Sequence, residues 1–88
     1  MTKYALVTGG SRGIGRAICL ELADMGYHIL INYQSNVEEA NKTLELVKAK
    51  GVGGELMKFD VSKQNEVDEV LGKWMDTEKE NRVIEVLI

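Results

Sequence analysis

The length, composition and charge of this chain exclude several classes of protein. Its 88 residues allow one small domain, and a hydrophobic fraction of 44% with 28% charged residues is typical of a globular chain. A net charge of −3 provides no basic surface for nucleic acid or anionic lipid, and a single cysteine with a single histidine excludes a disulfide framework and a structural zinc site.

The first residues predict neither a leader nor a membrane anchor. The apolar run Tyr4–Val7 is interrupted at once by Thr8-Gly9-Gly10. A secretory signal needs ~7–15 apolar residues and a membrane-spanning helix needs ~20. We therefore expect a soluble, cytoplasmic protein without a membrane or nucleic-acid partner.

Strand-like and helix-like stretches alternate along the chain with short connections. Apolar or alternating runs predict strands at residues 4–7, 28–33, 55–59 and 83–88. Helical spacing of apolar residues predicts a helix from Ile14 to Met25, a second helix between Ser35 and Gly51, and a third after Ser62. Ser35 and Glu38 have the spacing of a capping box at the start of the second helix.

This order, βαβαβαβ, predicts an α/β fold: the N-terminal half of a Rossmann-type, doubly wound parallel sheet with strand order 3-2-1-4. In that order the third helix covers only part of one face of the sheet. Because the sequence stops within the apolar run 83–88, we expect residues 1–88 to form a truncated portion of one larger domain, without its C-terminal catalytic portion. An uncovered face and an apolar edge strand would favour a homo-oligomer.

The most informative segment is Thr8-Gly9-Gly10-Ser11-Arg12-Gly13-Ile14-Gly15, which follows a predicted strand and opens a predicted helix. In this context Gly9 allows a sharp turn, Gly13 leaves room for a pyrophosphate, and Gly15 lets the helix pack closely. Unpaired N–H groups at the start of the helix attract phosphate. A glycine-rich turn that binds nothing is the alternative, but the order of strand, motif, helix and strand favours a dinucleotide site.

The end of the second predicted strand bears on the choice between NAD and NADP. NAD-preferring sites usually carry an acidic residue ~20 residues after the glycines. This chain instead has Asn32-Tyr33-Gln34-Ser35, without an acid. Arg12 could supply positive charge to a 2′-phosphate, with Asn32 and Ser35 as possible hydrogen-bond donors. The pattern favours NADP(H), although Arg12 could also be a solvated loop residue.

Asp60 and Val61 follow the third predicted strand, at the edge of the sheet where ligands bind in such folds. Asp60 could accept a hydrogen bond from the amino group of adenine. It could equally belong to the cap of the third helix, since Ser62 follows it. The spacing alone leaves both interpretations open.

Taken together, these residues resemble the short-chain dehydrogenase/reductase family. The resemblance rests on the run 8–15, the Asn32-Tyr33 strand end and Asp60-Val61, and it covers the whole chain. It is strongest to the 3-oxoacyl-[acyl-carrier-protein] reductases of fatty acid synthesis. That group implies NADPH-dependent reduction of a 3-oxoacyl thioester, usually in a tetramer, but the sugar and alcohol dehydrogenases of the family share this region.

Position by position, the resemblance assigns cofactor contacts to the following residues. They are Gly9, Ser11, Arg12, Gly13, Ile14 and Gly15 in the phosphate loop, with Arg12 also on the 2′-phosphate, and Asp60 and Val61 at adenine. The family's catalytic Asn, Ser, Tyr and Lys have no counterpart, since none of Tyr4, Tyr27 and Tyr33 is followed by lysine four residues later. We expect this chain alone to be inactive; a non-catalytic nucleotide-binding or self-associating module is the alternative.

Overall fold

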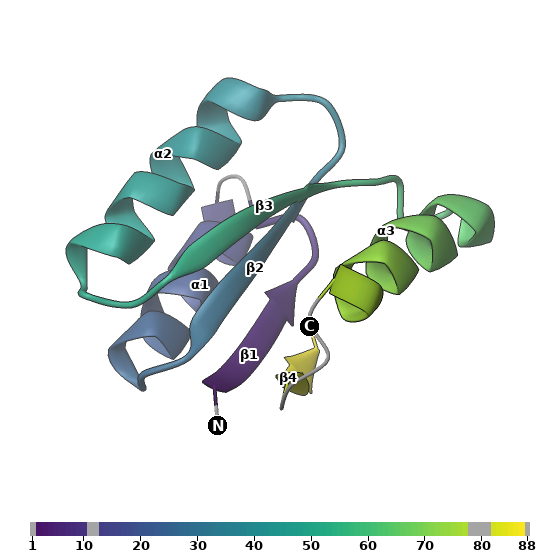
Figure 1. Cartoon of the computed structure of the whole chain (residues 1–88). Helices are drawn as coiled ribbons and strands as arrows, with labels where there is room; N and C mark the ends of the chain where they lie inside the picture. Colours follow the sequence, from purple (N-terminus) through teal and green to yellow (C-terminus); the bar gives the residue numbers. More distant parts are fainter. Residues whose placement is uncertain (1, 11–12, 78–81, 88) are drawn as a thin grey trace.

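The structure is a computed structural model that describes residues 2–10, 13–77 and 82–87, with side-chain surroundings for residues 3–10 and 13–73. Strands and helices alternate along the described chain (Figure 1). The strands are β1 Thr2–Val7, β2 His28–Tyr33, β3 Gly54–Lys58 and β4 Arg82–Leu87, and the helices are α1 Gly13–Asp24, α2 Val37–Ala49 and α3 Gln64–Thr77. This is the alternation that the spacing of apolar residues predicts.

The described strands form one parallel sheet in the order β3-β2-β1-β4, which confirms the predicted α/β fold class and strand order. The β1–β2 ladder ends at Val7 opposite Ile31, whereas the β2–β3 ladder continues to Tyr33 opposite Lys58. The carboxyl ends of β1, β2 and β3 therefore meet at one edge of the sheet. In open parallel sheets this is the edge at which ligands bind.

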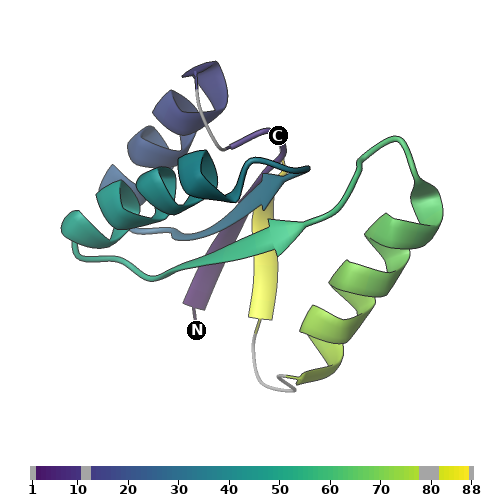
Figure 2. The ribbon, with the colours of Figure 1, turned by 90° about the horizontal axis from the view of Figure 1, so that it is seen from above.

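One face of the sheet is covered by α1 and α2, and the other face by α3 (Figure 2). The cluster under α1 and α2 consists of the buried residues Ala5, Val7, Cys19, Leu22, Ala23, Ile29, Ile31 and Val47. Because alternate side chains of β1 and β2 point to opposite, covered faces, both strands can be apolar throughout, as strands of buried parallel sheets are.

The second face carries a smaller cluster under α3. Its buried members are Tyr4, Leu6, Leu30, Met57 and Phe59, and Val67, Val70 and Leu71 of α3 pack against them. None of the five buried side chains is more than 6% exposed. α3 lies over these residues, but Val67, Val70 and Leu71 are themselves only partly buried, and the burial of β4 lies outside the described residues. That α3 covers only part of this face therefore stays a prediction.

The ends of the helices differ in detail from the sequence prediction. Asn36 is the N-cap of α2, and its side-chain oxygen accepts a hydrogen bond of 3.1 Å from the Glu39 N–H. The predicted capping by Ser35 is wrong by one residue. Ile14 and Met25, which are 82% and 70% exposed, lie at the two ends of the predicted helical run, beyond the part of α1 that packs on the sheet.

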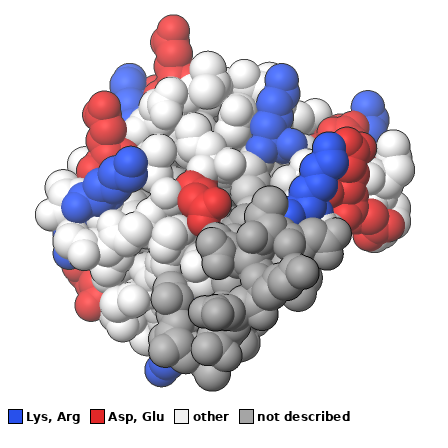
Figure 3. All heavy atoms as spheres, viewed as in Figure 1, with Lys and Arg blue, Asp and Glu red and all other residues white. Residues whose placement is uncertain are grey.

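Charges are mixed on the face of the molecule that Figure 3 shows. Among the residues that the structure describes, acidic and basic side chains are interspersed there, without a large patch of one sign. This face therefore gives no indication of a polyanionic partner.

Among the described helices, none combines the length and the apolar content needed to cross a bilayer.

Candidate functional site

The glycine-rich segment leaves β1 at the carboxyl edge of the sheet. Gly9 and Gly13 both have φ of 65°, in the left-handed region that residues with a Cβ rarely adopt, and a Cβ at either position would meet no atom within 4 Å. A Cβ at Gly15 would collide with the carbonyl oxygen of Gly9 and lie 2.8 Å from its carbonyl carbon. The first turn of α1 therefore packs directly on the turn that follows β1. The predicted contacts of Ser11 and Arg12 lie outside the described residues.

The backbone N–H groups of the two consecutive glycines are turned toward β2. The Gly9 N–H donates to Asn32 Oδ1 at 3.1 Å, and the Gly10 N–H donates to the Asn32 carbonyl at 3.0 Å. These two groups are therefore not available to a phosphate. The candidate donors are therefore in later residues, including the first turn of α1 at Gly13 and Ile14, where helical N–H groups lack intrahelical partners. This is the start of the helix at which the sequence predicts phosphate to bind.

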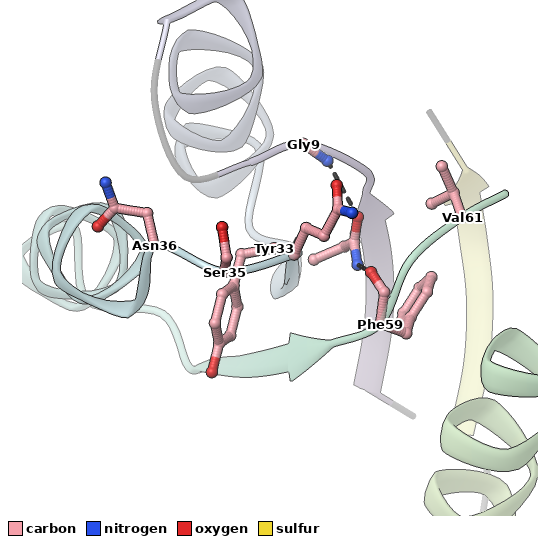
Figure 4. A pocket seen from close by; sticks show the side chains of 8 residues that line it. Gly9, Tyr33, Ser35, Asn36, Phe59 and Val61 are labelled. Atoms are coloured by element: carbon pink, nitrogen blue, oxygen red, sulfur yellow. Dashed lines mark hydrogen bonds between the residues drawn. The ribbon is translucent and has the colours of Figure 1, made fainter. Parts of the chain in front are cut away.

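A pocket of about 270 Å³ opens beside this turn, at the carboxyl ends of β1, β2 and β3 (Figure 4). Its lining residues are Gly9, Asn32, Tyr33, Gln34, Ser35, Asn36, Phe59 and Val61. Four of them, Gly9, Asn32, Ser35 and Val61, are among the site residues predicted from the sequence. Gln34 and Asn36 also line the pocket but were not predicted as site residues from the sequence. Their place shortly after the end of β2 is the signal that could have indicated them.

Asn32 has a different role from the one that its position in the sequence suggests. Its side chain is buried, with 3% exposed. Its Nδ2 donates to the carbonyl oxygens of Met57 at 3.3 Å and Phe59 at 3.0 Å. Both amide hydrogens are used inside the protein, so this conformation leaves Asn32 no donor for a 2′-phosphate.

Asp60 stabilises the turn between β3 and α3. Its Oδ1 accepts hydrogen bonds from the Ser62 hydroxyl at 2.7 Å and the Ser62 N–H at 2.9 Å, and these bonds lower the pKa of Asp60. Its Oδ2 accepts a hydrogen bond of 3.1 Å from Nε2 of Gln34, which lines the pocket. Asp60 thus binds Ser62 in the turn before α3, which begins at Gln64, and both interpretations of Asp60, a contact to adenine and a part of the helix cap, stay predictions. Its neighbour Val61 is 56% exposed and lines the pocket.

Arg16 connects the two helices that begin near the pocket. Its Nε donates to Thr43 Oγ1 at 2.8 Å and its Nη2 donates to the Glu39 carbonyl at 2.9 Å, so α1 is bound to the first turns of α2. Glu39 also accepts a hydrogen bond from Lys42, which is the main cause of its lowered pKa. Spacing along the sequence did not indicate this connection, because its partners are far apart in the chain.

Comparison with known proteins assigns the chain to a family. The sequence profile of the short chain dehydrogenases matches residues 3–88. The chain belongs to this family. Its members are NAD(P)-dependent oxidoreductases, which supports a nicotinamide dinucleotide as the cofactor class.

Individual members of the short chain dehydrogenase family resemble the chain over most of its length. A 3-oxoacyl-[acyl-carrier-protein] reductase of Staphylococcus epidermidis is 46% identical over 71 residues, which cover 81% of this chain and 29% of that protein. Versicolorin reductase 1 of Dothistroma septosporum is 46% identical over 74 residues, covering 84% of this chain and 27% of that protein. The chain thus spans less than a third of the length of these relatives.

A solved structure of the family has the same fold. The crystal structure of a metagenomic short-chain oxidoreductase in complex with NADP superposes with a TM-score of 0.84 at 26% identity. The superposition covers 97% of this chain and 37% of the other. The described sheet and helices therefore match the dinucleotide-binding architecture of that family.

Proposed function

We propose that this chain forms the NADP(H)-binding N-terminal portion of a single Rossmann-type domain in a short-chain oxidoreductase. The observation that carries the proposal is the pocket at the carboxyl ends of β1, β2 and β3, bordered by Gly9 and by the segment that enters α2. Ligands bind at this place in open parallel sheets because strand ends and helix starts meet there. The proposed cofactor contacts are Gly9, Ser11, Arg12, Gly13, Ile14, Gly15, Ser35, Asp60 and Val61.

The described residues fit such a cofactor. Left-handed Gly9 and Gly13 face open space, so a phosphate could approach the backbone and the start of α1 without meeting a Cβ. None of the described residues that line the pocket is acidic, so nothing among them would repel a 2′-phosphate. Arg12 lies outside the described residues, and its role as the cation follows from its place in the sequence. The bound dinucleotide would supply the hydride.

For the whole enzyme, we propose reduction of 3-oxoacyl-[acyl-carrier-protein] to the 3-hydroxyacyl form in fatty acid synthesis. Support comes from the 46% identity to a reductase of that name over most of this chain. A different substrate, such as another ketone or alcohol, is the second candidate, because versicolorin reductase 1 is equally similar. Since the chain contains no tyrosine followed by lysine four residues later, we propose that it binds the cofactor and has no turnover of its own.

Calorimetric titration of the full chain with NADPH, NADP⁺ and NADH tests the cofactor assignment. We expect NADP(H) to bind more tightly than NAD(H), and Arg12→Ala to weaken NADP(H) binding about 10- to 100-fold. This follows because a charged hydrogen bond contributes about 1.5–3 kcal/mol and about 1.4 kcal/mol corresponds to tenfold in affinity. Lys48→Ala, which removes an exposed cation in the last turn of α2, is the matched control.

The possible outcomes separate the parts of this proposal. If neither dinucleotide binds, the proposed function is wrong. If NAD(H) and NADP(H) bind equally and Arg12→Ala changes neither, only the assignment of NADP(H) fails. Reduction of a 3-oxoacyl thioester by this chain alone would contradict the proposal that it has no turnover.

A further inference from the structure

One buried side chain connects both sides of the pocket. Asn32 Oδ1 accepts the Gly9 N–H at 3.1 Å, and Asn32 Nδ2 donates to the carbonyl oxygens of Met57 at 3.3 Å and Phe59 at 3.0 Å. Figure 4 marks the bonds at Gly9 and at Phe59, both of which line the pocket. A single planar amide therefore joins the turn after β1 to the end of β3.

The bonds to the glycine turn lie beyond the last ladder pair between β1 and β2. The β1–β2 ladder ends at Val7 opposite Ile31, so no further ladder pair fixes the turn that contains Gly9. Beyond that pair, the turn is held to β2 by the two hydrogen bonds that Asn32 accepts, from the Gly9 and Gly10 N–H groups. The Asn32 side chain is thus a described link between this turn and the end of β3.

The chemistry of this position suits asparagine. Its amide offers one acceptor and two donors, and here each has a buried or partly buried backbone partner. A carboxylate would place negative charge against the carbonyls of Met57 and Phe59. An apolar side chain would remove all three of these hydrogen bonds. Either change nearly keeps the volume of the side chain but removes the hydrogen bonds that join the Gly9 turn to Met57 and Phe59.

We propose that Asn32 is a positioning residue that sets the separation between the glycine turn and the β3 side of the pocket, so that one dinucleotide can contact both. This inference rests on the proposed function. In this fold the phosphates of a dinucleotide lie at the turn and its adenosine lies toward the neighbouring strands. Loss of the connection therefore weakens ligands that span both sides more than ligands that contact one side.

The test compares two ligands on the ¹⁵N-labelled full chain by NMR titration. NADP⁺ spans the pocket, whereas adenosine 2′-monophosphate lacks the pyrophosphate and contacts only the adenosine side. We expect Asn32→Leu to weaken NADP⁺ about tenfold or more, as the lost hydrogen bonds would, and adenosine 2′-monophosphate by less than about threefold. Equal losses for both ligands would show a merely structural role and overturn the proposal.

A pH series adds a readout that loss of stability alone does not give. In Asn32→Asp, burial raises the pKa of the introduced carboxyl, and its protonation restores an O–H donor. The NADP⁺ affinity of this variant, compared with wild type at the same pH, should therefore recover as pH falls toward about 5. Asn32→Leu, which has similar volume and no proton to gain, should show no recovery. If Asn32→Asp binds NADP⁺ like wild type at every pH, the inference is wrong while the proposed function stands.

A measurement on the unmodified chain keeps the inference testable if the variants do not fold. The Gly9 N–H should exchange with solvent slowly and keep its chemical shift when NADP⁺ is added, whereas the N–H groups of Gly13 and Ile14 should shift. Fast exchange of the Gly9 N–H would overturn the proposed role of Asn32. Absence of any NADP⁺ binding to the unmodified chain would instead overturn the proposed function.

Discussion

Substitution of Gly15 by alanine gives the sharpest test of how α1 is seated on the glycine turn. The added Cβ would collide with the carbonyl oxygen of Gly9, and would lie 2.8 Å from its carbonyl carbon and 3.0 Å from the Gly10 Cα. All three are backbone atoms, so no side chain can rotate away, and the start of α1 or the turn itself must move.

The magnitude follows from two opposing effects. Overpacking at a close contact costs about 1–3 kcal/mol, and replacing glycine by alanine within a helix recovers about 0.5–1 kcal/mol. We therefore expect Gly15→Ala to lower the free energy of unfolding by about 1–2 kcal/mol. For a chain of this size, that corresponds to a Tm lower by about 4–15 °C.

Gly72 provides the matched control, since it also lies in a helix but a Cβ there would meet no atom within 4 Å. Gly72→Ala should raise the free energy of unfolding by about 0.5–1 kcal/mol and leave NADP⁺ affinity unchanged. Thermal and urea unfolding followed by circular dichroism, with NADP⁺ titration of both variants, make the comparison. If Gly15→Ala is as stable as wild type and binds NADP⁺ equally well, the close packing of α1 on the turn is not as described.

Two further predictions concern the core and the edge of the sheet. Burial raises the pKa of the Cys19 thiol to about 11. Iodoacetamide should therefore leave the native chain unmodified at about pH 8 and react with it after unfolding in urea, which mass spectrometry would show. Rapid labelling of the native chain would contradict the described burial. The outer side of β4 pairs with no other described strand, so we expect concentration-dependent self-association through this edge in sedimentation velocity, and a monomer at every concentration would refute it.

The topology of the sheet could be predicted because it depends on local patterns. Apolar runs and helical spacing identify the elements, and the constraint on crossover connections then leaves few strand orders. The cap of α2 could not be located in the same way. Ser35 with Glu38 and Asn36 with Glu39 have identical capping-box spacing, and only the three-dimensional structure shows that Asn36 accepts the hydrogen bond.

The roles of two site residues could not be predicted because their partners are distant in the sequence. Arg16 binds Thr43 and Glu39 across the α1–α2 contact, and a pattern of charges along the chain contains no signal for such a contact. Asn32 stood out as a polar residue at the end of an apolar strand, which suggested exposure at a ligand site. The structure instead buries it, with its amide donating to the carbonyl oxygens of Met57 and Phe59.

The glycine motif therefore specifies where a ligand can approach but not which N–H groups face it. The Gly9 N–H is held by the side chain of Asn32, 23 residues away, and the Gly10 N–H by the main-chain carbonyl of the same residue. With these groups turned toward β2, a phosphate at the turn must rely on the start of α1, whose closeness to the turn depends on the missing Cβ of Gly15. Substitution of Asn32, which is proposed to act by positioning, should for this reason lower dinucleotide affinity as strongly as substitution of a residue that contacts the dinucleotide.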